Sequence, residues 1–134
     1  MMEEVKKPTV KRSKSKVARQ VSHGQAHIHA SYNNTMVTIT DLNGNTLAWS
    51  SAGHMGFKGP KKSTPFAASQ VVEDVVKKAL NFGVKEVNVL VYGIGSGKDS
   101  AIRTLHSAGL SVLSIKDITL TPHNGCRPPK PRRL

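Results

Sequence analysis

The chain has 134 residues, enough for one domain with a buried core, and its formal net charge is +12 at pH 7. This charge favours a polyanionic partner, whereas an aromatic content of only 4% argues against a surface that reads sequence by stacking on bases. The single cysteine, Cys126, excludes an intramolecular disulfide, and no apolar run approaches the roughly 20 residues of a membrane-spanning helix.

The positive charge is concentrated at the two ends of the chain and in one internal segment. Residues 1–19 carry +5, residues 54–64 carry +3 and residues 127–134 carry +4, while all other residues together carry no net charge. A near-neutral body with basic extremities is typical of a protein that neutralises phosphates, and merely solvated termini are the alternative. We expect a basic N-terminal extension over residues 1–19, an α/β domain over 20–121 and an extended basic tail over 122–134.

Three short strands are predicted first. Residues 25–30 and 35–40 have β-like patterns, and residues 47–51 return as a partner strand after the Asn43-Gly44 pair. Asn-Gly is the strongest short hairpin signal, because a two-residue primed turn needs positive φ at both central residues. We therefore expect a tight hairpin here, followed by an irregular loop over residues 52–64.

Two helices and two more strands follow. Thr64 can cap a helix that begins at Pro65, continues with an i, i+3, i+4 apolar stripe and stops at Gly83. The run "EVNVLVY" at 86–92 predicts a strand buried on both faces, and residues 110–120, after a shorter helix, predict the last strand. This order predicts a mixed α/β sheet, with the loop after residues 86–92 at the carboxyl edge, where α/β proteins bind ligands.

The loop "GIGSGK" at 93–98 resembles a nucleotide-binding turn only in part. The P-loop pattern would need glycine in place of Tyr92 and serine or threonine in place of Asp99, and the dinucleotide pattern would need glycine in place of Lys98. These failures argue against a nucleotide hydrolase. Two interpretations stay open: Lys98 and the helix N-terminus contact a backbone phosphate, or the glycines only permit a tight strand-to-helix turn.

Metal-binding and catalytic patterns are weak. Zinc needs four clustered ligands, and a nuclease that shares the fold would need two or three carboxylates converging on a metal ion. The only candidates for these roles are His27 and His29 on one strand face, His123 and Cys126 in the tail, and the scattered Asp41, Asp99 and Asp117. We predict that the protein is not an enzyme and has no cofactor and no metal.

Three stretches closely resemble small-subunit ribosomal protein S-eleven of the bacterial type. They are "ASYNNTMVTITDLNGNTLAWSSAG" (30–53), "GFKGPKKSTPFAA" (56–68) and residues 100–134, and the similarity covers residues 20–134, with "KSTPFAA" and "PHNGCRPPK" as its most specific blocks. The resemblance implies a three-layer α/β/α fold with a mixed five-stranded sheet, related to ribonuclease H but without its catalytic carboxylates. One departure lies at 93–98, where members of the family commonly have "GPGPGR" and this chain has neither proline and a lysine in place of the arginine.

The resemblance also implies a structural role without catalysis. Such a protein binds 16S ribosomal RNA in the platform of the small subunit, beside the E site and the exit path of messenger RNA, with ribosomal proteins S-seven and S-eighteen as neighbours. We expect it to be cytoplasmic, in a ribosome of bacterial rather than organellar type. The expected RNA-binding residues are Phe57, Lys58, Lys61, Lys62, Ser63, Lys98, His123, Asn124, Arg127, Lys130, Arg132 and Arg133. For Phe57, packing against the start of the first helix is an equal alternative to stacking on a base.

Overall fold

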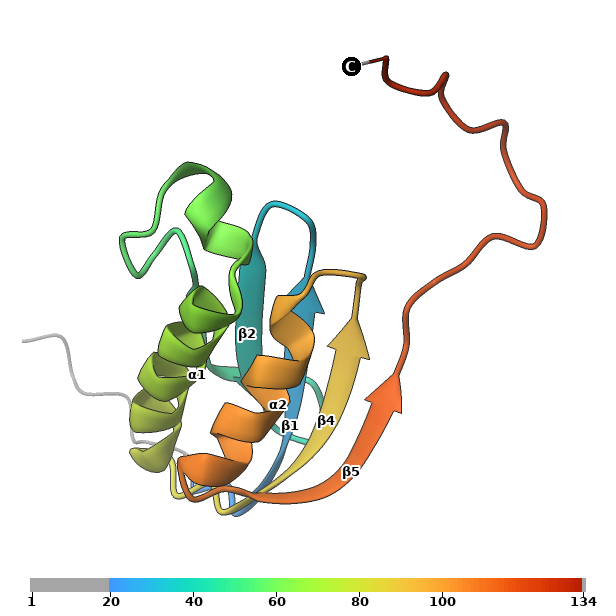
Figure 1. The fold of residues 1–134 in the computed structure, drawn as a ribbon. Helices are drawn as coiled ribbons and strands as arrows, with labels where there is room; N and C mark the ends of the chain where they lie inside the picture. Colours follow the sequence, from blue (N-terminus) through green and yellow to red (C-terminus); the bar gives the residue numbers. More distant parts are fainter. Residues whose placement is uncertain (1–19, 134) are drawn as a thin grey trace, which may run out of the picture.

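A computed structural model describes residues 20–133 as one five-stranded sheet with two α-helices (Figure 1). The elements in chain order are β1 (His23–Ala30), β2 (Thr35–Thr40), β3 (Thr46–Ser51), the 3-10 helix η1 (Gly59–Ser63), α1 (Pro65–Leu80), β4 (Glu86–Tyr92), α2 (Gly97–Ser107) and β5 (Ser111–Asp117). The sheet order is β3-β2-β1-β4-β5, with β1–β4 and β4–β5 parallel and the other two pairs antiparallel. The predicted mixed α/β sheet is confirmed.

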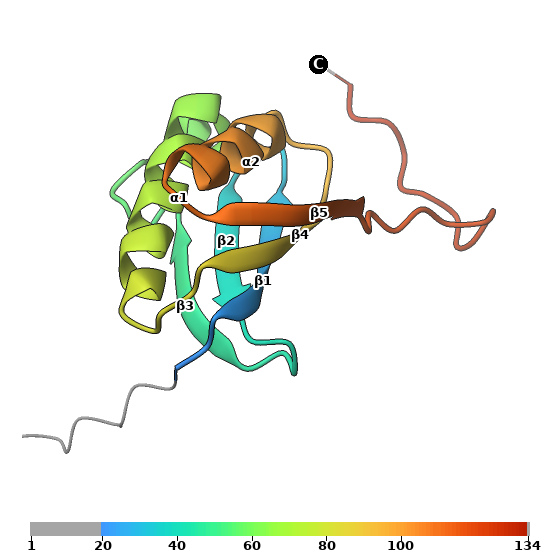
Figure 2. The same cartoon turned by 90° about the horizontal axis from the view of Figure 1, so that it is seen from below.

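Both helices pack against the same face of the sheet (Figure 2). The core between the two layers contains Ile28 and Val89 from the strands, Val71 and Val75 from α1, and Leu105 from α2. Alternate strand residues point into this core because side chains alternate between the two faces of a strand. Residues 20–133 therefore form two layers. The second helical layer that the resemblance implies is not found among them.

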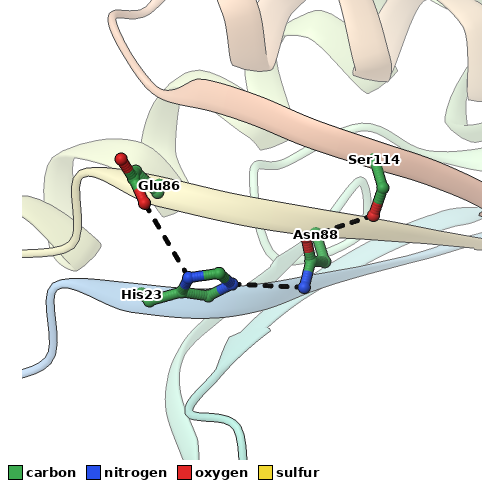
Figure 3. Close-up of polar contacts among 4 residues, drawn as sticks. All are labelled: His23, Glu86, Asn88 and Ser114. Carbon is green, nitrogen blue, oxygen red and sulfur yellow. Dashed lines mark hydrogen bonds and ion pairs between the residues drawn. The ribbon is translucent and has the colours of Figure 1, made fainter.

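The opposite face of the sheet is lined by polar side chains from three adjacent strands (Figure 3). The Nδ1 atom of His23 lies 3.8 Å from the carboxylate of Glu86, its Nε2 atom lies 3.2 Å from the amide nitrogen of Asn88, and Ser114 donates to Asn88 Oδ1 at 3.1 Å. The prediction that β4 is buried on both faces is wrong, because its residues alternate between buried and at least partly exposed. The β-forming residues of β4 reflect its place between two paired strands rather than two covered faces.

The β2–β3 connection is longer than the predicted two-residue turn. Only Gly44 has a positive φ (+93°) in this loop, whereas the primed turn would need one at Asn43 as well. The Gly44 amide donates to the Asp41 carbonyl at 3.2 Å, and the Asp41 carboxylate accepts from the amides of Asn43 and Asn45 at 2.9 Å each. These bonds favour a wider loop with one left-handed glycine, and the ladder between the strands shifts register beside it.

The predicted start of α1 is confirmed, whereas its C-cap is Asn81, in a right-handed conformation, rather than the predicted Gly83. The Thr64 hydroxyl accepts from the Ala67 amide at 3.2 Å, and Pro65 is the first helical residue. Beyond the last helical residue, Gly83 has φ +75° and its amide donates to the Leu80 carbonyl at 3.1 Å. The segment 52–64 is predicted to be an irregular loop, and the structure adds one short helix to it, η1. This helix contains Lys61 and Lys62 and lies directly before α1.

Candidate nucleic-acid interface

The glycines of the 93–98 loop allow it to lie against the end of β1. A Cβ atom on Gly93 would overlap the carbonyl oxygen of Ala30, and one on Gly95 would lie 2.5 Å from the carbonyl oxygen of Ser31. The loop amides are also used inside the protein, since Gly93 donates to the Thr119 hydroxyl at 3.1 Å and Gly95 donates to the Ala30 carbonyl at 2.9 Å. The tight-turn interpretation therefore holds for these glycines, and their amides are not free to bind a phosphate.

This loop joins two of the basic segments. The Ser96 hydroxyl donates to the Ser63 carbonyl at 3.1 Å, which connects the start of α2 to η1. On the other side, Thr119 contacts Gly93 at the point where the chain leaves β5. Figure 1 shows η1, the start of α2 and the end of β5 at one end of the domain, where the parallel strands also end. We call this end the carboxyl edge.

Asp117 and Thr119 hold the beginning of the tail on the loop. The Thr119 hydroxyl donates to the Asp117 carboxylate at 2.6 Å, and the Thr119 amide donates to the same oxygen at 2.9 Å. The amide of Ile118 donates to the Val91 carbonyl at 2.8 Å. The two Thr119 bonds, followed by the positive charge of Lys98, hold the pKa of the Asp117 carboxyl below its usual value. Asp117 thus stays ionised, and the direction of the tail is fixed as far as Thr119.

The predicted cations of the domain lie near this edge and are not neutralised. Among residues 20–133 the ion pairs are His23–Glu86 and Asp74–Lys78, so no carboxylate in this range comes within ion-pair distance of the cations expected to bind RNA. The domain members of that set are Lys58, Lys61, Lys62 and Lys98, which we call the carboxyl-edge cluster. Lys58 and Lys61 are exposed, whereas Lys62 and Lys98 are half-buried. Unpaired ammonium groups gathered at one end favour a polyanion.

The tail residues extend away from this cluster. Regular structure ends at Asp117, and the chain then runs outward without further elements (Figure 1). All described residues after Thr119 are exposed, and Asn124 has a left-handed φ of +70°. The predicted tail residues share this exposed position and are His123, Asn124, Arg127, Lys130, Arg132 and Arg133. They adjoin the cluster through the start of the tail but do not pack against it.

The aromatic residues at this edge differ from the prediction. Phe57 is half-buried against the core, and its ring makes an edge contact with Phe66 at a centroid distance of 6.1 Å. This is the packing alternative, and stacking of Phe57 on a base stays a prediction. Two more aromatic rings are exposed: Phe66, the second residue of α1, with 65%, and Tyr32, in the β1–β2 connection, with 74% of its surface exposed. Phe66 could have been found from the sequence, because it lies outside the apolar stripe of its helix.

The groups considered for metal binding and nuclease chemistry do not come together. Asp41 lies in the β2–β3 loop at the opposite edge from Asp99 and Asp117, and no group of three or more potential ligands occurs within residues 20–133. His27 Nε2 lies 3.2 Å from the Thr40 hydroxyl, and His29 stacks on the neighbouring Tyr92 ring. No helix in this range is long and apolar enough to cross a membrane.

Comparison with protein families identifies the chain. The family model described as "Ribosomal protein S11" matches residues 24–133, a range that begins in β1 and includes every later element, the carboxyl-edge cluster and the tail. The match covers most of the chain and agrees with the segregated positive charge. The chain therefore belongs to the ribosomal protein S11 family, as a structural, RNA-binding constituent of the ribosome.

Proposed function

We propose that the carboxyl-edge cluster and the tail bind 16S ribosomal RNA in the platform of the small subunit. The observation that supports this most strongly is that two basic segments, residues 54–64 and the tail, adjoin the loop that carries Lys98, through the Ser63–Ser96 and Gly93–Thr119 hydrogen bonds. None of these cations lies within ion-pair distance of a carboxylate among the described residues. A surface of this kind gains affinity when RNA phosphates replace its counterions.

The two parts of this interface play different roles. Lys58, Lys61, Lys62 and Lys98 are attached to regular structure, so they can meet phosphates at fixed positions. The tail carries four cations among prolines, and prolines favour an extended backbone. Such a backbone can thread between RNA helices, and it loses less conformational entropy on binding than a flexible chain does. Recognition then depends mainly on the shape and backbone of the RNA.

The finer features follow from the family resemblance. We propose that the protein lies beside the E site and the exit path of messenger RNA, with ribosomal proteins S-seven and S-eighteen as neighbours, and that it performs no catalysis. The single cysteine and the bacterial-type sequence blocks favour a cytoplasmic ribosome of bacterial type.

Charge reversal at the cluster tests the proposed RNA contact. We expect the double variant Lys61→Glu, Lys62→Glu to co-sediment less with small-subunit particles at high salt than the unaltered protein. The matched control is Lys77→Glu, Lys85→Glu, which makes the same charge change at exposed positions outside the carboxyl edge. Equal retention of both variants, or an unaltered protein that stays in the soluble fraction, would contradict the proposal.

A further inference from the structure

The strand β5 forms an unprotected edge of the sheet. It is last in the strand order and pairs only with β4, so one side of its backbone has no strand partner among residues 20–133. The opposite edge, β3, is partly covered, because the Lys78 ammonium of α1 donates to the carbonyl of Trp49 at 3.3 Å. Proteins commonly block exposed edges in this way to prevent pairing with another chain. On β5 the charged side chains are confined to Lys116 and Asp117 at its end, so the stretch Ser111–Ile115 is left without a charged residue and can pair with another chain.

An apolar groove runs beside this edge. It lies between α2 and β5, has a volume of about 560 Å³ and is lined by Ile102, Arg103, His106, Ser107, Val112 and Ile115. Ile115 is 57% exposed and Leu113, on the same strand, is 52% exposed. Large apolar side chains that cluster on a surface mark interaction sites more often than isolated ones do. Because RNA presents phosphates and sugars, this apolar lining favours a protein occupant.

The charge of the groove narrows the choice of occupant. Its charged and titratable lining residues are Arg103 and His106, and it is lined by no carboxylate. On the strand itself the exposed Lys116 is followed by the exposed Asp117, so the positive charge beside the groove is that of Arg103. The chain's own residues 1–19 carry seven basic residues against two acidic ones, and a second copy of this protein would bring the same cations. Both would meet repulsion, whereas a segment with acidic side chains would be attracted.

We infer that β5 and the α2–β5 groove dock an extended segment of a neighbouring ribosomal protein that carries alternating apolar and acidic side chains. The segment adds a sixth strand to the sheet through main-chain hydrogen bonds. Its apolar residues enter the groove beside Ile115, and its acidic residues meet Arg103. This inference rests on the proposed function, since it requires the protein to be assembled into a subunit, but it uses a surface separate from the carboxyl-edge cluster.

Photo-crosslinking in purified small subunits tests this surface. The photoreactive amino acid benzoylphenylalanine is placed at Ile115, and in a second variant at Leu113 in case the first fails to assemble. The control position is Leu42, an equally exposed leucine in the β2–β3 loop. We expect both β5 positions to crosslink to one peptide of another ribosomal protein with alternating apolar and acidic residues, and Leu42 not to reach that peptide. Crosslinks to RNA, to residues 1–19 or to a second copy, or no crosslink, would overturn the inference.

A charge variant tests the electrostatic part. Arg103→Glu should lower the crosslink yield from Ile115 by roughly tenfold, whereas Lys77→Glu, with the same charge change on α1, should leave it unaltered. Equal yields in both variants would show that acidic side chains do not meet Arg103. Co-sedimentation is measured on the same samples. A protein that enters subunits but gives no β5 crosslink overturns only the docking, whereas one that never enters subunits overturns the proposed function as well.

Discussion

The tight contact between the 93–98 loop and β1 can be tested by adding a single methyl group. Gly93 and Gly109 have nearly the same φ, +103° and +102°. Their surroundings differ, because a Cβ on Gly93 would overlap the backbone of Ala30, whereas a Cβ on Gly109 would have no heavy atom within 4 Å. Alanine at either position is strained by a positive φ of the same size, so the difference between the two variants reports mainly the close approach.

The expected magnitudes follow from these two terms. Gly109→Ala should lower the free energy of unfolding by about 1–2 kcal/mol, the cost of placing a Cβ in the left-handed region. Gly93→Ala has the same cost and, in addition, must push apart two backbone segments, which adds about 1–3 kcal/mol. The obstructing atom belongs to the main chain of a central strand, so it cannot move aside as a flexible side chain would.

Urea unfolding followed by circular dichroism measures both variants under the same conditions. We predict a midpoint clearly lower for Gly93→Ala than for Gly109→Ala, with similar slopes, because the surface exposed on unfolding is unchanged. Equal losses would refute the reasoning, since they would show that Gly93 is needed only for its φ and that the loop does not depend on its contact with β1.

Three further predictions concern the tail and the stability of α1. Deleting residues 127–134 should flatten the salt dependence of ribosomal RNA affinity by up to about 0.9 slope unit per lost phosphate contact, and an unchanged slope would place the tail away from phosphates. Thr119→Val should weaken RNA binding several-fold in the full chain, because Thr119 fixes the direction of the tail, but not in a chain that ends at residue 121. Thr119→Ser should restore binding in the full chain. A loss of equal size in both chains would mean that Thr119 affects only the domain and not the tail. The Lys78 ammonium lies 2.8 Å from the Asp74 carboxylate and holds the pKa of Asp74 below its usual 3.8. Above pH 3.8 this pair therefore stabilises the fold by about 0.3–0.5 kcal/mol. This stabilisation is lost as the pH falls through the lower pKa of the folded state. Urea unfolding at pH 6 and pH 3 should therefore show a smaller pH dependence for Asp74→Asn than for the unaltered protein, and identical dependence would contradict the assignment.

Local signals in the sequence were sufficient for most of the fold. The start of α1 could be predicted because Thr64 and Pro65 act on the backbone within a few residues of themselves, whereas Gly83 indicated its end only to within three residues. The prediction of a two-residue turn at Asn43-Gly44 was wrong because of Asp41. Its carboxylate accepts three hydrogen bonds from the loop and so stabilises a longer connection than the pair alone would favour. The prediction that both faces of β4 are buried was wrong, because burial of the second face depends on whether distant segments cover it. The composition of the strand itself carries no information about such segments.

The candidate interface could be predicted in part. The cations were evident from charge alone, since basic segments separated by a neutral body are visible in the sequence. Their convergence was not, because it depends on the Ser63–Ser96 and Gly93–Thr119 contacts between residues 26 or more positions apart. The role of the glycines was left open for the same reason. Whether a glycine binds a ligand or makes room for a neighbouring strand is decided by Ala30 and Ser31, more than 60 positions away.

Directed hydroxyl-radical probing of assembled small subunits tests the central claim most directly, namely that the basic segments at the carboxyl edge form one RNA interface. In the unaltered protein an iron chelate is attached to the natural Cys126. In two further variants Cys126→Ser removes this site, and the chelate is attached through Lys62→Cys or through Asn45→Cys. Asn45 lies in the β2–β3 loop at the opposite edge. We predict strong cleavage from positions 126 and 62 in the same or adjoining segments of 16S ribosomal RNA, and weaker cleavage elsewhere from position 45. Strong cleavage from position 45, with none from positions 62 and 126, would contradict the account.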